Sequence, residues 1–139
     1  MSVKAPKIGF IFPGQGSQHL GMCKDFYDKE RIVQEYFEQA ANCVGQNFVQ
    51  LCFAGSEESL RDTVNAQTSI FLASAAICEL LKKKYEIVPD IVAGNSSGEY
   101  AAIFAAGGMS FYDTIYLLKK RATFMNEATK QFNGGLLAV

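Results

Sequence analysis

The sequence predicts an α/β fold that is built on a mainly parallel sheet. Three short apolar runs occur along the 139 residues, at Ile8–Phe12, Pro89–Gly94 and Leu136–Val139. Short, continuous apolar runs of this kind are typical of strands that are buried on both faces of a parallel sheet. The stretches between them carry apolar residues at helical spacing, so we expect right-handed strand–helix–strand crossovers.

Three helical patterns lie between the first two apolar runs. From Met22 to Val44 apolar side chains recur at helical spacing, which predicts one helix. Ser56 is followed by two glutamates, as expected of an N-cap residue and an acidic first turn. Gln67–Tyr85 carries one apolar stripe and ends in three lysines at positions 82–84, a basic cluster that the helix dipole favours.

Two further helices are predicted after the second apolar run. Small residues fill Gly98–Ala106, so this helix can pack closely on the sheet. Ser110 and Asp113 have the spacing of a capping box, which predicts the start of a long helix that reaches about Lys130. The sequence ends within the third apolar run, and an end within a buried strand is unusual for a complete domain.

The composition argues against several classes of function. The 13 basic and 14 acidic residues give a net charge of −1, so no nucleic-acid partner is expected. The four cysteines form no C-x-x-C pair and there is one histidine, so we expect reduced thiols and no metal site. No window approaches about 18 uninterrupted apolar residues, so we expect a cytoplasmic protein without a membrane span.

The first candidate motif is G-x-S-x-G at Gly94–Gly98, in which Ser96 holds the central position. A strand is predicted before the motif and a helix after it, which is the context of a nucleophile elbow. Ser96 would then be an exposed nucleophile, and the backbone amide of Ser97 would receive an oxyanion. The residues alone leave open an ordinary loop in which one of the two serines caps the helix.

A glycine-rich turn follows the first apolar run, with the sequence FPGQGSQ from Phe12 to Gln18. The third glycine of a dinucleotide fingerprint is replaced by His19, and the lysine of a P-loop is absent. The free amides of such a loop, which includes Gln15, can supply a second oxyanion donor. A plain turn is the alternative.

The third candidate is Arg121, which shares a stripe of the last predicted helix with Thr114, Leu117 and Ala128. An arginine in phase with such neighbours usually extends to solvent or pairs with an internal acid. The functional alternative is a guanidinium that holds a substrate carboxylate through two parallel hydrogen bonds.

Together, the three motifs resemble those of the malonyl-CoA:acyl-carrier-protein transacylases, acyltransferases that serve fatty-acid and polyketide synthesis. The matching residues are FPGQGSQ at Phe12–Gln18, G-x-S-x-G-E-Y at Gly94–Tyr100 and R-x-x-F-M at Arg121–Met125. The resemblance implies a three-layer α/β fold of the acyltransferase and α/β-hydrolase-like type. It covers only the N-terminal part of the large subdomain, without the family's small ferredoxin-like subdomain.

The resemblance also implies a ping-pong transfer of malonyl from coenzyme A to a serine and then to the thiol of an acyl carrier protein. No cofactor is implied beyond the coenzyme A thioester, which is a substrate. The resemblance assigns the nucleophile to Ser96, the oxyanion donors to the backbone amides of Ser97 and Gln15, and the malonyl carboxylate to Arg121. Gln67 lies where the family often has Thr-Gln-Pro, but the proline is replaced and Gln67 is left outside the site.

The chain departs from the family pattern in two respects. Asn95 precedes the serine where the family usually has histidine, so the acyl preference is less defined. The resemblance implies that the family's catalytic histidine lies beyond Val139, and His19 is expected to be a surface or loop residue, so we expect the 139 residues alone to transfer malonyl at no useful rate. Two other functions stay open, namely an acyl hydrolase of the same fold and a non-catalytic module that binds the carrier protein or coenzyme A.

Overall fold

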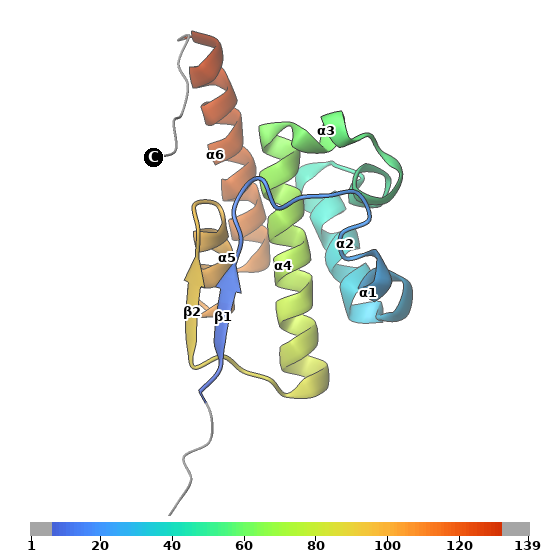
Figure 1. Cartoon of the computed structure of the whole chain (residues 1–139), viewed down its shortest axis with the longest axis vertical. Helices are drawn as coiled ribbons and strands as arrows, with labels where there is room; N and C mark the ends of the chain where they lie inside the picture. The colour runs from blue at the N-terminus through green and yellow to red at the C-terminus, as the bar shows by residue number, and fades with distance from the viewer. Residues whose placement is uncertain (1–6, 132–139) are drawn as a thin grey trace, which may run out of the picture.

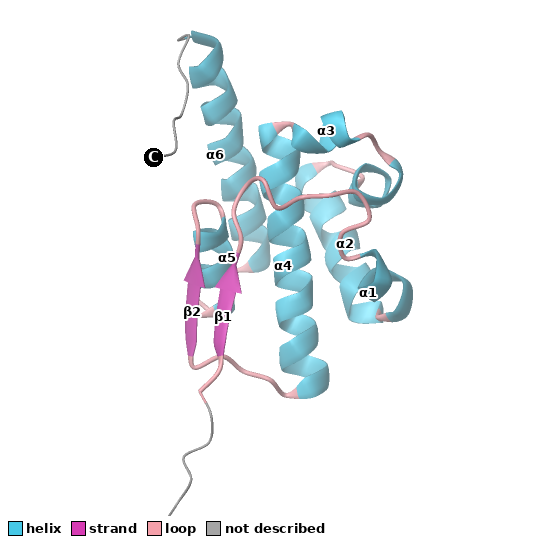
Figure 2. Cartoon of the chain, viewed as in Figure 1, coloured by secondary structure: helices cyan, strands magenta, loops and turns pink. Residues whose placement is uncertain are grey.

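The computed structural model describes residues 7–131, in which a small parallel sheet is combined with helices. The strands are β1 (Gly9–Phe12) and β2 (Ile91–Gly94). The helical elements are α1 (Lys24–Lys29), α2 (Arg31–Val44), the π-helix η1 (Gln50–Ala54), α3 (Glu57–Arg61), α4 (Thr63–Tyr85), α5 (Gly98–Ala105) and α6 (Phe111–Gln131). Figure 2 shows that helix dominates this part of the chain. The prediction of a mixed α/β fold is confirmed at this level.

The two strands are parallel neighbours, although about 80 residues of helical chain connect them. Their register runs from Gly9 opposite Ile91 to Phe12 opposite Gly94. Both strands therefore end at the same edge of the sheet, and the loops that follow them lie side by side (Figure 1). The third predicted strand, at residues 136–139, lies outside the described residues.

The prediction that the strands are buried on both faces is wrong for the part of the chain that the structure describes. Phe12 is buried and Phe10 packs against the core, whereas the side chains that alternate with them are open: Ile11 is 85% exposed and Ile91 is 69% exposed. Successive side chains of a strand point to opposite faces. Helix α5 contacts both strands, and no element within residues 7–131 covers the other face.

Helix α4 forms the centre of the described structure and contacts α2, α5 and α6 (Figure 1). Seven consecutive residues, Ala66–Leu72, are buried, so this helix has no single apolar stripe of the kind that was predicted. Among residues 7–131, it is also the one helix that is long and apolar enough to cross a membrane, judged by length and composition alone. However, 61% of its apolar window is buried inside the protein, which is typical of a central core helix.

Two predicted helix boundaries change because of local backbone geometry. The helix expected over Met22–Val44 is divided at Glu30, whose extended backbone (φ −122°, ψ 110°) separates α1 from α2. Helix α4 begins four residues before the predicted Gln67. Asp62 caps it, because its Oδ1 accepts hydrogen bonds from the backbone N–H groups of Val64 at 2.9 Å and Asn65 at 3.2 Å.

Other predicted boundaries are confirmed. Ser56 caps α3 by accepting a hydrogen bond from the Ser59 N–H at 3.1 Å. Ser110 caps α6, since its Oγ accepts from the Asp113 N–H at 3.1 Å and donates to the carboxylate of the same residue at 2.6 Å. The lysines at positions 82–84 lie in the last turn of α4.

An aromatic cluster fixes α6 relative to α4 and α5. The rings of Phe71 on α4 and Phe111 on α6 stack with centroids 5.6 Å apart, and Phe104 on α5 packs edge-on against both. Tyr36 of α2 completes the cluster, with its centroid 4.7 Å from that of Phe111. Aromatic contacts of this kind hold the helices in one relative orientation. That orientation determines which residue of α6 reaches the loop between β2 and α5.

Candidate active site

The loop between β2 and α5 makes a sharp turn with Ser96 at its centre. Ser96 has a φ of 52°, a left-handed conformation that few residues other than glycine adopt. Two hydrogen bonds close the turn, from the Gly98 N–H to the Asn95 carbonyl at 2.8 Å and from the Glu99 N–H to the Ser96 carbonyl at 3.1 Å. A strained serine between a strand and a helix is the geometry of a nucleophile elbow.

The two glycines of the motif are required by close backbone contacts. A Cβ atom on Gly94 would overlap the carbonyl oxygen of Gly98, and one on Gly98 would overlap the carbonyl oxygen of Phe12. Gly14, in the loop after β1, is restricted in the same way, because a Cβ there would lie 2.6 Å from the Asn95 carbonyl oxygen. The loops after β1 and β2 therefore touch through their backbones, and only glycine permits this approach.

The two adjacent serines have different environments. Ser96 is exposed, whereas Ser97 is 3% exposed and its Oγ has no hydrogen-bond partner among the described residues. Ser97 occupies the N-cap position of α5 but makes no side-chain cap hydrogen bond. The alternative that its hydroxyl caps the helix is therefore wrong. Ser96 is the serine whose hydroxyl is accessible to a ligand.

Two backbone amides at this edge of the sheet are free to act as donors. Within residues 7–131, neither the Ser97 N–H nor the Gln15 N–H donates a hydrogen bond to protein. Hydrogen bonds between other residues hold the loop that carries Gln15. Ser17 donates to the Gly14 carbonyl, and the Gly16 N–H donates to Gln18 Oε1 at 2.8 Å. Free amides at the end of a strand are suited to receive an anionic oxygen.

Arg121 of α6 reaches this turn from a position 25 residues later in the sequence. Its Nη1 donates to Gln67 Oε1 at 2.7 Å, and its Nη2 lies 3.4 Å from Ser96 Oγ. The guanidinium carbon is 5.8 Å from the centroid of the Tyr100 ring, which is within cation–π range. The structure thus brings together Ser96 and Arg121, two residues that the sequence proposed for one site.

Arg121 makes no salt bridge with any carboxylate in the described part of the chain, although its side chain is half-buried. The alternative in which it pairs with an internal acid is therefore wrong within residues 7–131. Its predicted stripe holds only in part, since Thr114 is buried but Leu117 is 42% exposed. A half-buried cation whose protein partners are neutral remains able to bind an external anion.

Gln67 belongs to this site and was left out by the sequence reasoning. It is 1% exposed, accepts from Arg121, and donates from Nε2 to Gln15 Oε1 at 3.1 Å. The Gln15 side chain also donates to Thr63 Oγ1 at 3.4 Å. The sequence feature that could have identified Gln67 is its place in the family's Thr-Gln-Pro pattern. Its side-chain direction depends on how α4 packs against α6, which no local pattern encodes.

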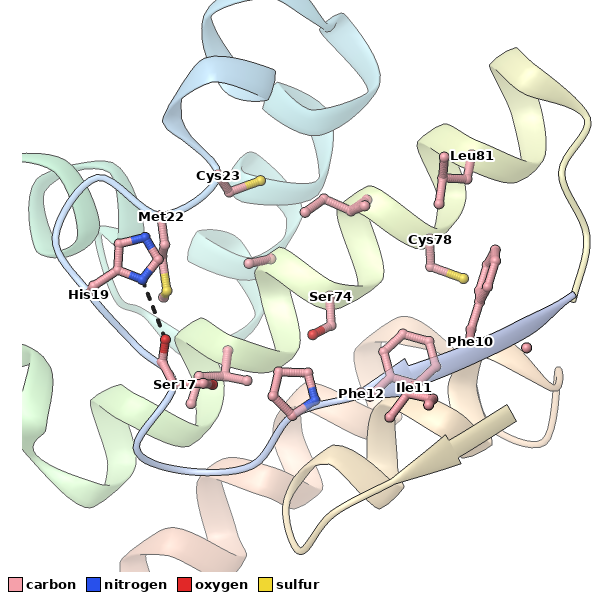
Figure 3. Close-up of a pocket in the computed structure, with 15 residues that line it drawn as sticks. Phe10, Ile11, Phe12, Ser17, His19, Met22, Cys23, Ser74, Cys78 and Leu81 are labelled. Carbon is pink, nitrogen blue, oxygen red and sulfur yellow. Dashed lines mark hydrogen bonds between the residues drawn. The ribbon is translucent and has the colours of Figure 1, made fainter. Parts of the chain in front are cut away.

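His19 lies in a different place, as expected for a loop residue. It is exposed and lines a groove of about 460 Å³ between β1, α4 and the loop before α1 (Figure 3). Its Nδ1 lies 3.4 Å from the carbonyl oxygen of Ser17, and no hydrogen bond joins it to Ser96. The structure gives no support for His19 as the base of Ser96.

The thiols beside this groove are not suited to act as nucleophiles. Burial raises the pKa of Cys23 to about 12 and also raises the pKa of Cys78, so both remain protonated at neutral pH. All four cysteines are free, as predicted. Among residues 7–131, no group of three or more potential ligands could hold a metal ion. Among the described residues, Ser96 is the exposed hydroxyl at a strand–helix turn that lies beside Arg121.

The chain was compared with known protein families and with curated proteins. Residues 9–139 match the model of a family described as "Acyl transferase domain". The chain is 41% identical over 133 residues to the malonyl CoA-acyl carrier protein transacylase of Bacillus subtilis (strain 168), a match that covers 96% of this chain and 42% of the relative. It is 35% identical to the protein of the same name from Escherichia coli (strain K12), covering 96% of this chain and 43% of that relative. The chain therefore spans about two fifths of the length of these relatives.

Solved structures give the same result. The malonyl CoA-acyl carrier protein transacylase of Coxiella burnetii superimposes with a TM-score of 0.87 at 36% identity, over 92% of this chain and 40% of that one. A malonyl-transacylase in complex with its type II PKS acyl-carrier protein gives a TM-score of 0.85 at 36% identity, over 88% of this chain and 40% of that one. The resemblance that the three motifs predicted is confirmed.

Proposed function

Because the chain belongs to the acyl transferase domain family, we propose that it takes part in the transfer of a malonyl group from coenzyme A to the thiol of an acyl carrier protein. The proposal places Ser96 as nucleophile, the amides of Ser97 and Gln15 as oxyanion donors, and Arg121 as the partner of the malonyl carboxylate. The named activities of relatives such as the Bacillus subtilis transacylase support this assignment.

One observation carries the choice of a carboxylated acyl group. Arg121 is half-buried, has no carboxylate partner within residues 7–131, and has one nitrogen 3.4 Å from Ser96 Oγ. A malonyl group on Ser96 carries a carboxylate that can accept two parallel hydrogen bonds from the guanidinium. A simple acyl chain offers nothing to this cation, so a hydrolase for simple acyl groups is disfavoured.

The chemistry divides into two acyl transfers. The Ser96 oxygen attacks the thioester carbonyl, the carbon–sulfur bond breaks, and coenzyme A leaves as a thiol after it has received the serine proton. Malonyl then remains as an ester on Ser96. In the second transfer the thiol of the carrier protein attacks this ester, and the serine oxygen takes up the proton of that thiol. In both steps the developing oxyanion lies against the amides of Ser97 and Gln15.

These steps need a proton acceptor and no cofactor. The one histidine of the chain, His19, lines the groove beside β1, so the proposal assigns the acceptor to a group outside these 139 residues. General-base assistance contributes roughly 10²–10⁴-fold to such transfers. We expect the chain by itself to form the Ser96 ester slowly and to turn over poorly.

We infer that the two parallel strands and their helices belong to a three-layer α/β fold with a mainly parallel sheet. Residues 1–139 then correspond to the N-terminal part of its large subdomain, consistent with a match to about two fifths of the relatives' length.

The test measures ester formation instead of turnover, so that a slow reaction remains visible. The protein is incubated with malonyl-CoA, the adduct is mapped by peptide mass spectrometry, and acyl carrier protein bearing its phosphopantetheine thiol is then added. We expect one malonyl ester on Ser96, its absence in Ser96→Ala, and its transfer to the carrier protein. Release of free malonate at a rate that the carrier protein does not change would favour a hydrolase, and failure to label Ser96 contradicts the proposal.

A further inference from the structure

We propose that Gln67 is a positioning residue that gives the site its preference for carboxylated acyl groups and that couples Arg121 to the loop of Gln15. The inference rests on the proposed function, since it concerns the same site. The buried amide of Gln67 on α4 contacts both Arg121 on α6 and Gln15 in the loop after β1.

Both ends of the Gln67 amide are in use. Its Oε1 accepts from Arg121 Nη1 at 2.7 Å, and its Nε2 donates to Gln15 Oε1 at 3.1 Å and lies 3.5 Å from Met125 Sδ. Gln67 is 1% exposed, so its amide makes these contacts away from bulk solvent. Rotation of the amide by half a turn would direct an N–H group at the guanidinium and an oxygen at the Gln15 oxygen. The network therefore fixes the amide in one orientation.

This orientation determines which donors Arg121 offers to a ligand. One nitrogen is held by Gln67, the ring of Tyr100 lies near the guanidinium, and the other terminal nitrogen lies beside Ser96. A guanidinium has five N–H donors in a rigid plane, so fixing one of them fixes the direction of the rest. The remaining donors can then meet a carboxylate on an acyl group that is bound to Ser96.

An amide at position 67 also preserves the charge of the site. A carboxylate there would form an internal ion pair with Arg121 and would compete with the carboxylate of the acyl group. The neutral Gln67 accepts a hydrogen bond from Arg121 without supplying an opposing charge. The amide of Gln67 thus both orients Arg121 and leaves its charge free for the acyl carboxylate. Glutamate has the same shape and can still orient Arg121, but it neutralises the charge, so Gln67→Glu separates the two effects.

Gln67 further links Arg121 to the candidate oxyanion loop. The Gln15 side chain is held by Gln67 and by Thr63, and the backbone N–H of the same Gln15 is one of the free donors described above. We expect the capture of a carboxylate by Arg121 to alter the hydrogen bonds of the Gln67 amide and, through them, the position of Gln15. Gln67 is buried whereas Gln15 is exposed, so the low dielectric that strengthens hydrogen bonds acts at the Gln67 end of this network.

The first experiment compares Gln67→Glu and Gln67→Met with the parent chain. Thr68→Val is the matched control, since Thr68 is 2% exposed and, within the described part of the chain, its hydroxyl bonds only to backbone carbonyls of α4. The rates of Ser96 ester formation from malonyl-CoA and from acetyl-CoA are measured separately. We expect Gln67→Glu to lower the malonyl-to-acetyl rate ratio by roughly 10–100-fold, because its carboxylate pairs with Arg121 and competes with the carboxylate of the acyl group. Gln67→Met is expected to lower the ratio by about 10-fold, and Thr68→Val to leave it unchanged.

The second experiment needs no reaction. The backbone amide resonance of Gln15 is followed by NMR while the 139-residue chain is titrated with malonate or with acetate. We expect malonate to shift this resonance in the parent and in Thr68→Val but not in Gln67→Met, and acetate to shift it less. This readout detects coupling, which a purely structural glutamine would not provide.

The two experiments separate the inference from the proposed function. If the parent forms no ester on Ser96, the proposed function fails, and the malonate titration alone decides the inference. If the ester forms but the rate ratio and the Gln15 shift are the same in parent and Gln67→Met, the inference is overturned while the proposed function stands. Absence of a Gln15 shift in the parent also overturns it. Should Gln67→Glu fail to fold, as judged by circular dichroism, the methionine variant supplies the same decision.

Discussion

The guanidinium of Arg121 and the hydroxyl of Ser96 lie 3.4 Å apart, although one belongs to α6 and the other to the turn after β2. The aromatic cluster around Phe111 holds α6 in place, and the backbone contacts of Gly94 and Gly98 hold the turn. Two independent parts of the fold therefore converge on this pair. A cation that such rigid supports hold beside an exposed serine fits the role that we propose for Arg121, which is to bind the carboxylate of the acyl group.

Arg121→Ala is predicted to lower malonyl ester formation on Ser96 by about 10²-fold while acetyl ester formation is retained or increased. Breaking a buried carboxylate–guanidinium pair costs roughly 3–5 kcal/mol, and the half-exposed position of Arg121 reduces this figure. The measurement is the rate of ester formation from the two thioesters. The matched control is Lys120→Ala on the same helix, since Lys120 is exposed and its ammonium lies over the Tyr116 ring. An equal loss for both acyl groups would identify Arg121 as a structural residue.

Ser97→Ala is predicted to keep Ser96 labelling and to leave the free energy of unfolding unchanged or raised by up to about 1 kcal/mol. The Ser97 hydroxyl is buried and has no partner among residues 7–131, so its removal relieves a desolvation cost. The backbone N–H that we assign to the oxyanion is retained in alanine. Urea unfolding and peptide mapping after exposure to malonyl-CoA give the two readings, with Ser96→Ala as the unlabelled reference. Loss of labelling in Ser97→Ala would show that the hydroxyl itself takes part.

The sequence predicts those parts of the site that depend on neighbouring residues. The turn around Ser96 and the Ser110 cap follow from side-chain size and spacing within a few residues, and both are found. Gln67 was left out because its partners are Gln15, 52 residues earlier, and Arg121, 54 residues later. The burial of β1 was predicted wrongly for a similar reason. Composition shows that a strand is apolar, but elements distant in sequence decide which of its faces is covered.

Gly98→Ala is predicted to lower the free energy of unfolding by roughly 2–3 kcal/mol or more. The added methyl group meets the backbone carbonyls of Phe12 and Pro13, which cannot rotate away as a flexible side chain can. The control is Gly9→Ala, where the nearest atom is a side-chain methyl of Ile91 at 3.3 Å, and a change within about 1 kcal/mol is expected. Chemical denaturation of the two variants provides the comparison. Similar stabilities would argue against the close approach of the two loops.

Glu86→Gly is predicted to stabilise the protein by about 1 kcal/mol. Glu86 ends α4 in a left-handed conformation (φ 54°, ψ 25°), and the N–H of the next residue, Ile87, bonds back to the Leu81 carbonyl at 3.0 Å. Glycine adopts this conformation without the steric cost that a Cβ atom imposes. The control is a glycine substitution three residues earlier and within the helix: Lys83→Gly is expected to destabilise the protein by about 1 kcal/mol. Opposite shifts of the two urea midpoints support the argument, and a loss in both variants contradicts it.

The stability of the fold is predicted to fall as the pH rises above about 9, because of its buried thiols. Burial raises the pKa of Cys23 from 9.0 to about 12, with a further contribution from Cys52, and burial also raises the pKa of Cys52 and Cys78. The folded protein therefore holds protons that the unfolded chain releases, so this contribution is complete below the unfolded pKa and is lost as the pH rises toward the folded one. Urea unfolding between pH 7 and about pH 11 measures the effect, and Cys23→Ala should give a flatter dependence over the same range. A stability that stays constant from pH 8 to about pH 11 in the parent would show that the thiols ionise equally in both states.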